Sequence, residues 1–147
     1  MLKWLYFGAA AVAGVAMAFQ GTFNTVLTKA AGIWQSVFIV HAVGLAVTAV
    51  MLFFLKIGPA QFDKIISAPW YAFTGGLLNV VIIMAVMKAI GRIGVGNATT
   101  VIIVAQVLAA LFIDHSGAFG MKKYPLHWPD FLGVVLLAAG VRILLIK

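Results

Sequence analysis

The chain has 147 residues, of which 65% are hydrophobic and only 9% are charged, and its mean hydropathy is +1.16. A soluble domain has about 25% charged residues, so ten bases and three acids are too few to cover a water-exposed surface, and the composition indicates a membrane protein. The net charge of +7 does not predict nucleic-acid binding, because the bases stand singly at the ends of apolar runs, as at a membrane interface.

Five apolar segments are each about long enough to cross the hydrocarbon core as one α-helix, which needs roughly 20 apolar residues. All four prolines, at positions 59, 69, 125 and 129, fall outside these segments. The segments do not alternate polar with apolar residues, which excludes a membrane β-barrel. We therefore predict an all-α fold with five transmembrane helices in a single domain over residues 1–147. The predicted spans run from about Trp4 to Thr28, Ile33 to Leu55, Trp70 to Ile90, Val95 to Ile113 and Phe131 to Ile146.

The first segment begins like a secretory signal, with Lys3 before an apolar stretch and a small-residue pattern at 16–18. Its apolar character continues through Phe23 and Leu27, so we expect a retained membrane span. Gln20 and Asn24 are four residues apart and share one helix face beside Gly21. Such amides either make a helix–helix contact or line a polar cavity, and the two roles are compatible.

In the second segment Trp34, His41 and Thr48 recur every seven residues along one stripe. His41 is the only histidine inside a span. A lone membrane histidine can relay protons, or it can donate a hydrogen bond to a neighbouring carbonyl. Trp34 is a candidate for substrate contact and equally an interfacial anchor.

Asn79 lies near the midpoint of the third segment, where water is not available to its amide. In the fourth segment Thr99 and Gln106 are seven residues apart and share a face, with Gln106 near the centre of the membrane. A polar side chain at that depth is costly unless something satisfies it, and it is therefore a candidate for a functional site. The predicted substrate-binding set is Gln20, Asn24, Trp34, His41, Asn79, Thr99 and Gln106.

The remaining features of the sequence predict structure rather than chemistry. Asp114-His115 resembles an acid/base pair, but a helix terminus at the headgroups is the favoured interpretation. Gly133 and Gly140, seven residues apart in the fifth segment, form a small-residue stripe suited to helix pairing. Three dispersed histidines, three acids and no cysteine form no metal-ligand pattern, and no nucleophile–base pair is found, so neither cofactor nor enzyme activity is expected.

The ten bases divide equally between the two sides of the membrane if the chain crosses it five times. Orientation is normally set by an excess of Lys and Arg in the cytoplasmic loops, and here there is no excess. We therefore expect insertion in both orientations, so that two copies pair as an antiparallel homodimer. One side holds Lys3, Lys56, Lys64, Lys122 and Lys123, and the other Lys29, Lys88, Arg92, Arg142 and Lys147.

Several stretches resemble a known family. Residues 19–27, FQGTFNTVL, together with Ala98 to Gln106, the 111–117 stretch LFIDHSG and the 138–141 stretch AAGV, resemble the YdcZ-type half-length family of the drug/metabolite transporter superfamily. The resemblance implies half of a ten-helix inverted-repeat transporter, which works as a dimer in the bacterial inner membrane. It implies cavity-lining roles for Gln20, Asn24, Asn79 and Gln106. Since the family includes paired members, a hetero-partner remains open, and the even base count favours the homodimer.

The leading functional prediction is a secondary transporter that works by alternating access. The first segment lacks the embedded glutamate of the small multidrug exporters, which are similar in size, so a neutral or zwitterionic metabolite fits better than a cation. The alternatives are a dual-topology channel for a small ion and a membrane scaffold without transport activity.

Overall fold

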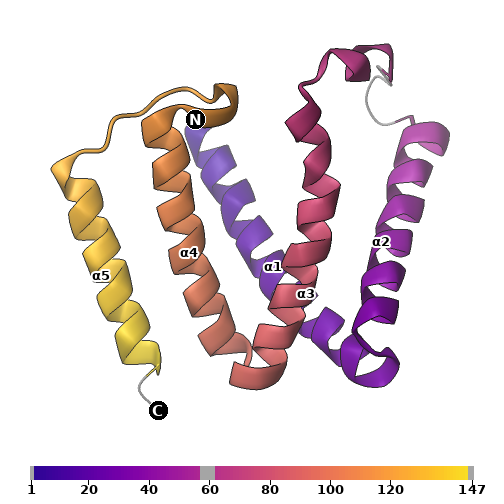
Figure 1. The fold of residues 1–147 in the computed structure, drawn as a ribbon, viewed down its shortest axis with the longest axis horizontal. Coiled ribbons are helices and arrows are strands. Elements are labelled where there is room, and N and C mark those ends of the chain that lie inside the picture. Colours follow the sequence, from indigo (N-terminus) through magenta and orange to yellow (C-terminus); the bar gives the residue numbers. More distant parts are fainter. Residues whose placement is uncertain (1, 57–61, 146–147) are drawn as a thin grey trace. The chain divides into compact units, whose positions relative to one another are not determined.

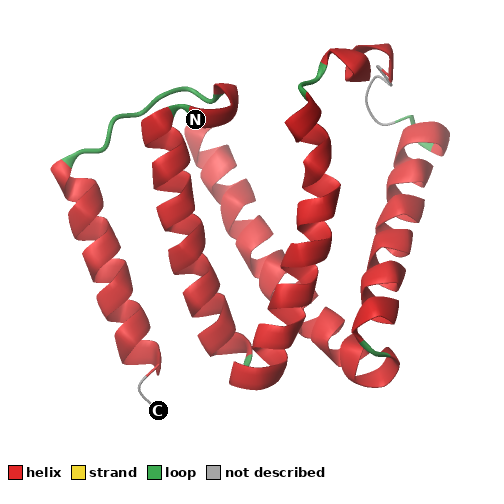
Figure 2. Cartoon of the chain, in the orientation of Figure 1, coloured by secondary structure: helices red, strands yellow, loops and turns green. Residues whose placement is uncertain are grey.

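The computed structural model describes residues 2–56 and 62–145. Over these residues the chain contains five helices that are long and apolar enough to cross a membrane (Figure 1). No strand occurs in the part of the chain that is described (Figure 2). The predicted all-α membrane fold is confirmed. The chain divides into two compact units, residues 1–91 and 92–147.

The first unit contains three long helices that run alternately up and down (Figure 1). Helix α1 covers Leu2–Ala31 and α2 covers Ile33–Ala49, which a π-helical turn, η1 (Val50–Phe54), continues. Two 3-10 helices, η2 (Phe62–Ser67) and η3 (Trp70–Thr74), precede α3 (Gly75–Ile93).

A single residue, Gly32, joins α1 to α2. Its φ of 87° and ψ of 164° lie in a region that is essentially restricted to glycine. The Gly32 N–H donates to the Thr28 carbonyl at 2.9 Å, and the Gly32 carbonyl accepts from the Ser36 N–H at 3.1 Å. The chain therefore reverses direction without leaving these backbone groups unpaired.

The buried core of the first unit lies between α2 and α3 near this joint. Val37, Ile83 and Met87 are at most 6% exposed, and the Thr28 hydroxyl of α1 lies 2.8 Å from the Met87 sulfur. Gly21 brings α1 close to α3, because a Cβ there would lie 2.9 Å from the end of Ile90. The partly buried side chains packed around this core are Ile33, Val40, Val80 and Met84.

The second unit is a pair of neighbouring antiparallel helices, α4 (Val95–Ser116) and α5 (Trp128–Leu145), with a 3-10 turn, η4 (Ala118–Gly120), between them (Figure 1). Gly94 precedes α4 with a φ of 82° and a ψ of 164°, nearly the conformation of Gly32. Helix α4 ends at Gly117, whose left-handed conformation lets its N–H donate to the Ile113 carbonyl at 2.9 Å.

The segment after α4 folds back onto the end of that helix. The Tyr124 N–H donates to the Asp114 carbonyl at 2.8 Å, and the Leu126 N–H donates to His115 Nδ1 at 3.2 Å. These contacts fit the predicted helix-terminus role of Asp114-His115. Helix α5 begins earlier than the apolar pattern indicated and includes Pro129 in its first turn, where a missing N–H has no partner to lose.

Most side chains of the spans are exposed. In the most apolar window of each span, between 0 and 17% of the residues are buried. Because lipid is as apolar as these side chains, exposure of Leu, Val or Phe needs no partner. Exposure of an amide is different, since nothing in the hydrocarbon can bond it.

Candidate functional site

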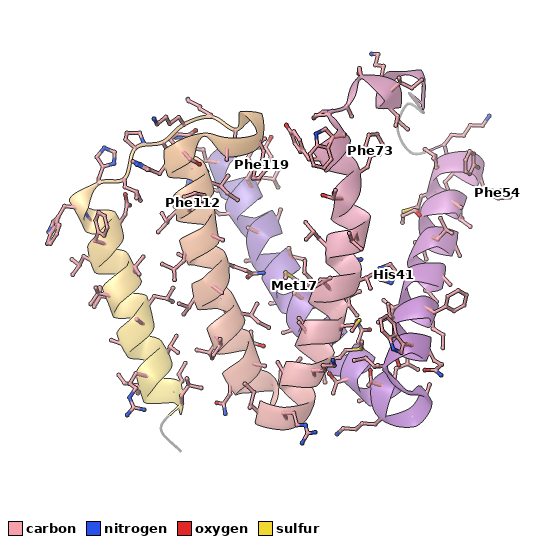
Figure 3. The ribbon with its side chains drawn as sticks, viewed as in Figure 1. Met17, His41, Phe54, Phe73, Phe112 and Phe119 are labelled. Atoms are coloured by element: carbon pink, nitrogen blue, oxygen red, sulfur yellow. The ribbon has the colours of Figure 1, made fainter. Side chains whose placement is uncertain are left out.

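A hydrogen bond between His41 and Asn79 joins the middle of α2 to α3. His41 Nδ1 lies 2.8 Å from the Val37 carbonyl oxygen of its own helix. Its Nε2 lies 3.1 Å from the Asn79 side-chain nitrogen. Figure 3 shows the His41 ring projecting from α2 toward α3. The contact with a neighbouring carbonyl is one of the two roles that the sequence left open for His41, and it is present in the structure. The second bond, to Asn79, was not predicted from the sequence.

The partners of the imidazole fix its tautomer. A carbonyl oxygen only accepts hydrogen bonds, so Nδ1 carries the proton and donates to Val37. Nε2 of the neutral ring is then a bare acceptor, and the Asn79 amide donates to it. The carboxamide of Asn79, which is exposed, keeps its oxygen and its second N–H free for another partner.

Asn24 presents the opposite situation on α1. The residue is 8% exposed, yet its carboxamide makes no hydrogen bond with any residue that the structure describes. Gln20, one turn earlier, is exposed and also unbonded over the described residues. No buried side-chain N or O atom of the described residues lacks a hydrogen-bond partner, so the unbonded Asn24 amide is accessible at the surface. It is therefore open to a ligand or to a partner chain.

Trp34 and Thr48, the outer members of the stripe through His41, are both exposed. Trp34 is 64% exposed near the start of α2, as an interfacial anchor or a site residue would be. The Thr48 hydroxyl donates to carbonyl oxygens of its own helix, at 2.9 Å to Gly44 and 3.0 Å to Leu45. Within this stripe only His41 bonds to another helix.

In the second unit, Thr99 is set apart from the other hydroxyl residues. The chain contains seven threonines and three serines, all of them described, and every one except Thr99 donates to a backbone carbonyl three or four residues earlier. Its neighbour Thr100 bonds to the Gly96 carbonyl at 2.7 Å. The Gln106 amide is exposed on α4 and has no hydrogen bond to any described residue. Thr99 and Gln106 thus place two unused polar groups on one helix.

Ser36 is a polar residue whose burial sequence analysis missed. It is 0% exposed, and its hydroxyl donates to the Gly32 carbonyl at 2.7 Å. The spacing of a serine four residues after a glycine at a helix joint was the available signal, since such hydroxyls bond back along the helix. Ser36 therefore stabilises the joint rather than contributing a free polar group.

Two apolar grooves run between α4 and α5. One encloses about 290 Å³, and the other, which Gly140 lines together with Thr100, encloses about 260 Å³. Neither is lined by Thr99 or Gln106, the residues of α4 in the predicted substrate-binding set. Among the described residues no group of three or more His, Asp or Glu is placed to hold a metal ion.

Five helices of the described chain are long and apolar enough to cross a membrane, and the side-chain amides of Gln20, Asn24 and Gln106 on them make no hydrogen bond to a described residue. A family model described as "Putative inner membrane exporter, YdcZ" matches residues 5–143. The chain belongs to the YdcZ family of the drug/metabolite transporter superfamily. The resemblance noted in the sequence is confirmed, and the chain is a multi-pass transport protein of the inner membrane. No curated protein and no solved structure matches this YdcZ-family chain.

Proposed function

We propose that this chain is half of a secondary transporter, which carries a small neutral or zwitterionic metabolite by alternating access as an antiparallel dual-topology homodimer. Its substrate site is lined by Gln20, Asn24, Trp34, His41, Asn79, Thr99 and Gln106. Each protomer takes in turn the conformation that the other has left. Outward transport is the direction that the family description supports.

The observation that carries the proposal is the unpaired carboxamide of Asn24. The residue is 8% exposed and no described group bonds to its amide, whose polar atoms are accessible at the surface, since no buried side-chain N or O atom of the described residues lacks a partner. Inside a membrane such an amide needs a ligand or a partner chain to complete its hydrogen bonding. A carboxamide offers both donors and acceptors, which suits a substrate that itself carries both.

Helix α4 supports the proposal from a second direction. Thr99 and Gln106 are two helical turns apart on one face, and both have free hydrogen-bonding groups. A threonine inside a membrane helix normally bonds to its own backbone, so a free Thr99 hydroxyl is available to a ligand. These groups add a second polar surface of the same chemical kind as that of α1.

The charge distribution supports the substrate class. The three acids of the chain are Asp63 in η2, Asp114 in the last turn of α4 and Asp130 in the first turn of α5, so none lies in the middle of a span. A cationic substrate would need a buried carboxylate as its counter-ion. Amides and hydroxyls instead compensate a neutral or zwitterionic molecule.

The antiparallel pairing rests on the base count and on the exposed amides. Five bases on each side give the insertion machinery no preferred orientation. The exposed Gln20 and Gln106 need a polar environment, which an inverted second copy with the same residues would supply. Gly133 and Gly140 on α5 are the proposed contact surface of the dimer. A paired family member in place of the second copy would be seen as a second chain in the purified complex.

The test begins with a thermal-shift screen of the purified protein against neutral and zwitterionic metabolites, because a bound ligand raises apparent stability. The best ligand is then followed as flux into proteoliposomes. Asn24→Leu and Gln106→Leu should each reduce flux at least tenfold while the dimer is retained. The matched control is Asn97→Leu, which removes an amide from another face of α4 and should leave flux near the parent value.

Two outcomes would overturn this proposal. Flux far faster than conformational cycling, which takes microseconds to milliseconds or longer, would indicate a channel. Leucine variants at Gln20, Asn24, Asn79 and Gln106 with unchanged phenotypes would indicate a scaffold.

A further inference from the structure

We propose that His41 is a proton-binding site within the membrane, and that rotation of the Asn79 carboxamide couples its protonation to the substrate site. The inference rests on the proposed transport function and adds its coupling ion. It comes from the two bonds of one ring, at 2.8 Å to the Val37 carbonyl and 3.1 Å to the Asn79 amide nitrogen.

The geometry leaves one position for the incoming proton. Nδ1 already carries hydrogen, so the proton binds Nε2, where it meets the Asn79 N–H that now donates to that atom. The bond from the Asn79 amide must break, because the protonated Nε2 is a donor and can no longer accept a hydrogen bond from the Asn79 N–H. A half-turn of the carboxamide about its Cβ–Cγ bond brings Oδ1 to accept the new Nε2–H. The bond from Nδ1 to Val37 is unchanged, and the added charge stays on the imidazolium.

No other titratable group faces His41 from the helices of its unit. Helix α2 contains no further ionisable residue between Ile33 and Ala49. Lys88 on α3 is nine residues beyond Asn79, which is about 13 Å along a helix axis. Among the described residues of α1, η3 and α3, the other such groups lie toward the ends of the spans: Lys3, Tyr6, Lys29, Tyr71 and Arg92.

The rotation changes what Asn79 presents to a substrate. With neutral His41 the free groups are Oδ1 and one N–H, so the amide can accept a bond from the substrate. With protonated His41 the oxygen is engaged with the ring, and the NH₂ group is free to donate. A substrate that donates to Oδ1 and a proton on Nε2 therefore compete, and each lowers the affinity for the other by the same factor. Such competition is the thermodynamic basis of proton/substrate exchange.

The proton site can be tested without a substrate. Full-length protein labelled with ¹⁵N in histidine and asparagine is studied by NMR in lipid nanodiscs, and the His41 resonances are identified by their loss in His41→Gln. Above the titration midpoint, Nδ1 should be protonated and Nε2 bare. On acidification the bare Nε2 signal should disappear, and the Asn79 amide resonances should shift with the same midpoint. Asn79→Leu should shift the Nε2 resonance, whereas Asn97→Leu should leave it unchanged.

A neutral ring protonated at Nε2 would overturn the inference. So would a His41 that does not titrate while the protein stays folded, or an Asn79 amide that does not respond. The coupling is measured as flux of the screened ligand under a pH gradient, which should raise flux several-fold in the parent and not in His41→Gln. An equal increase in flux in both proteins would refute the coupling through His41 but would not contradict the proposed transport function. Absence of flux in the parent instead removes the proposed function, and the NMR result then decides the proton site alone.

Discussion

Gly21 on α1 lies so close to Ile90 on α3 that a Cβ atom in its place would be 2.9 Å from Ile90 Cδ1. The same atom would be 3.0 Å from Val86 Cγ1. Two neighbouring side chains of α3 thus occupy the space that any larger residue would need. A larger residue at this position would have to displace the end of the Ile90 side chain and the Val86 methyl group.

Gly21→Val should lower the free energy of unfolding by about 2 kcal/mol, because overpacking a closed contact costs about 1–3 kcal/mol. The matched control is Gly14→Val on the same helix, where a Cβ would meet nothing within 4 Å. That control should be neutral or slightly stabilising, since valine is a better helix former than glycine. Denaturant unfolding of the purified proteins in micelles measures both, and equal effects would contradict the close contact.

The two single-glycine joints should tolerate no side chain. Gly32 and Gly94 have φ angles of +87° and +82°, where an L-residue is strained by about 1–3 kcal/mol. We expect Gly32→Ala and Gly94→Ala each to lower the unfolding free energy by that amount. Gly44→Ala, in the middle of α2 with nothing within 4 Å, should stabilise the helix slightly. A Gly94→Ala variant as stable as the parent would refute the strained conformation at that joint.

The apolar runs were sufficient to predict five helices, because length and hydropathy alone determine whether a segment can span a membrane. They did not predict the π-helical turn at Val50–Phe54 or the 3-10 turn at Trp70–Thr74. Both conformations depend on local backbone bonding, which the hydropathy of a segment does not encode. The early start of α5 was missed because Trp128 and Asp130 do not belong to an apolar run.

The sequence predicted individual candidate residues of the site but not the contacts between them. The apolar runs placed His41 inside one span and Asn79 near the midpoint of the next, but the register between two helices is not encoded in the sequence of either one. The His41–Asn79 bond therefore required the structure. The sequence also could not predict that the Thr99 hydroxyl is free. Thr100, the adjacent residue of the same type, donates to the backbone of its own helix.

Adding bases to one side should give the chain a single orientation. Ile66→Lys with Met121→Lys changes exposed residues in the two loops of one predicted side, so that the five-to-five distribution of bases becomes seven to five. The protein should then insert with those loops in the cytoplasm, and homodimer formation should fall. The control is the same pair of substitutions to glutamine. Because the native chain contains no cysteine, labelling of one cysteine introduced into the 117–127 loop reports the orientation, and a single orientation in the unmodified protein would contradict dual topology.

The dimer contact on α5 should be sensitive to bulk at its glycines. A Cβ at Gly133 or at Gly140 would meet nothing within 4 Å in the protomer, and the apolar groove of about 260 Å³ beside Gly140 leaves room for a larger side chain. Gly133→Ile and Gly140→Ile should weaken the dimer at least tenfold, because small residues permit close approach of membrane helices. Ala139→Ile, on a neighbouring face, serves as control. Single-molecule photobleaching in vesicles gives the dimer fraction, and unchanged fractions would place the contact on another surface.

The first turn of α5 should depend on the Asp130 carboxylate. Its Oδ2 accepts the His127 N–H at 2.7 Å, and loss of a side-chain cap costs about 1 kcal/mol. Asp130→Ala should therefore lower the unfolding free energy by about that amount, whereas Asp130→Asn keeps an acceptor and should lose less. Thermal unfolding in micelles distinguishes the two, and equal losses would mean that the negative charge rather than the hydrogen bond stabilises the turn.

The length of α1 has a consequence for the surrounding lipid. Lys3 and Lys29 lie 26 positions apart on this 30-residue helix, which is about 39 Å along its axis and close to the 40–45 Å between opposite headgroup layers. Each ammonium can thus reach a phosphate of a different leaflet while the helix stands nearly upright. Helix α5, with 18 residues, spans only about 27 Å and matches the acyl-chain interior alone. Helix α1 can therefore anchor both lipid surfaces, whereas α5 is free to follow a locally thinner bilayer.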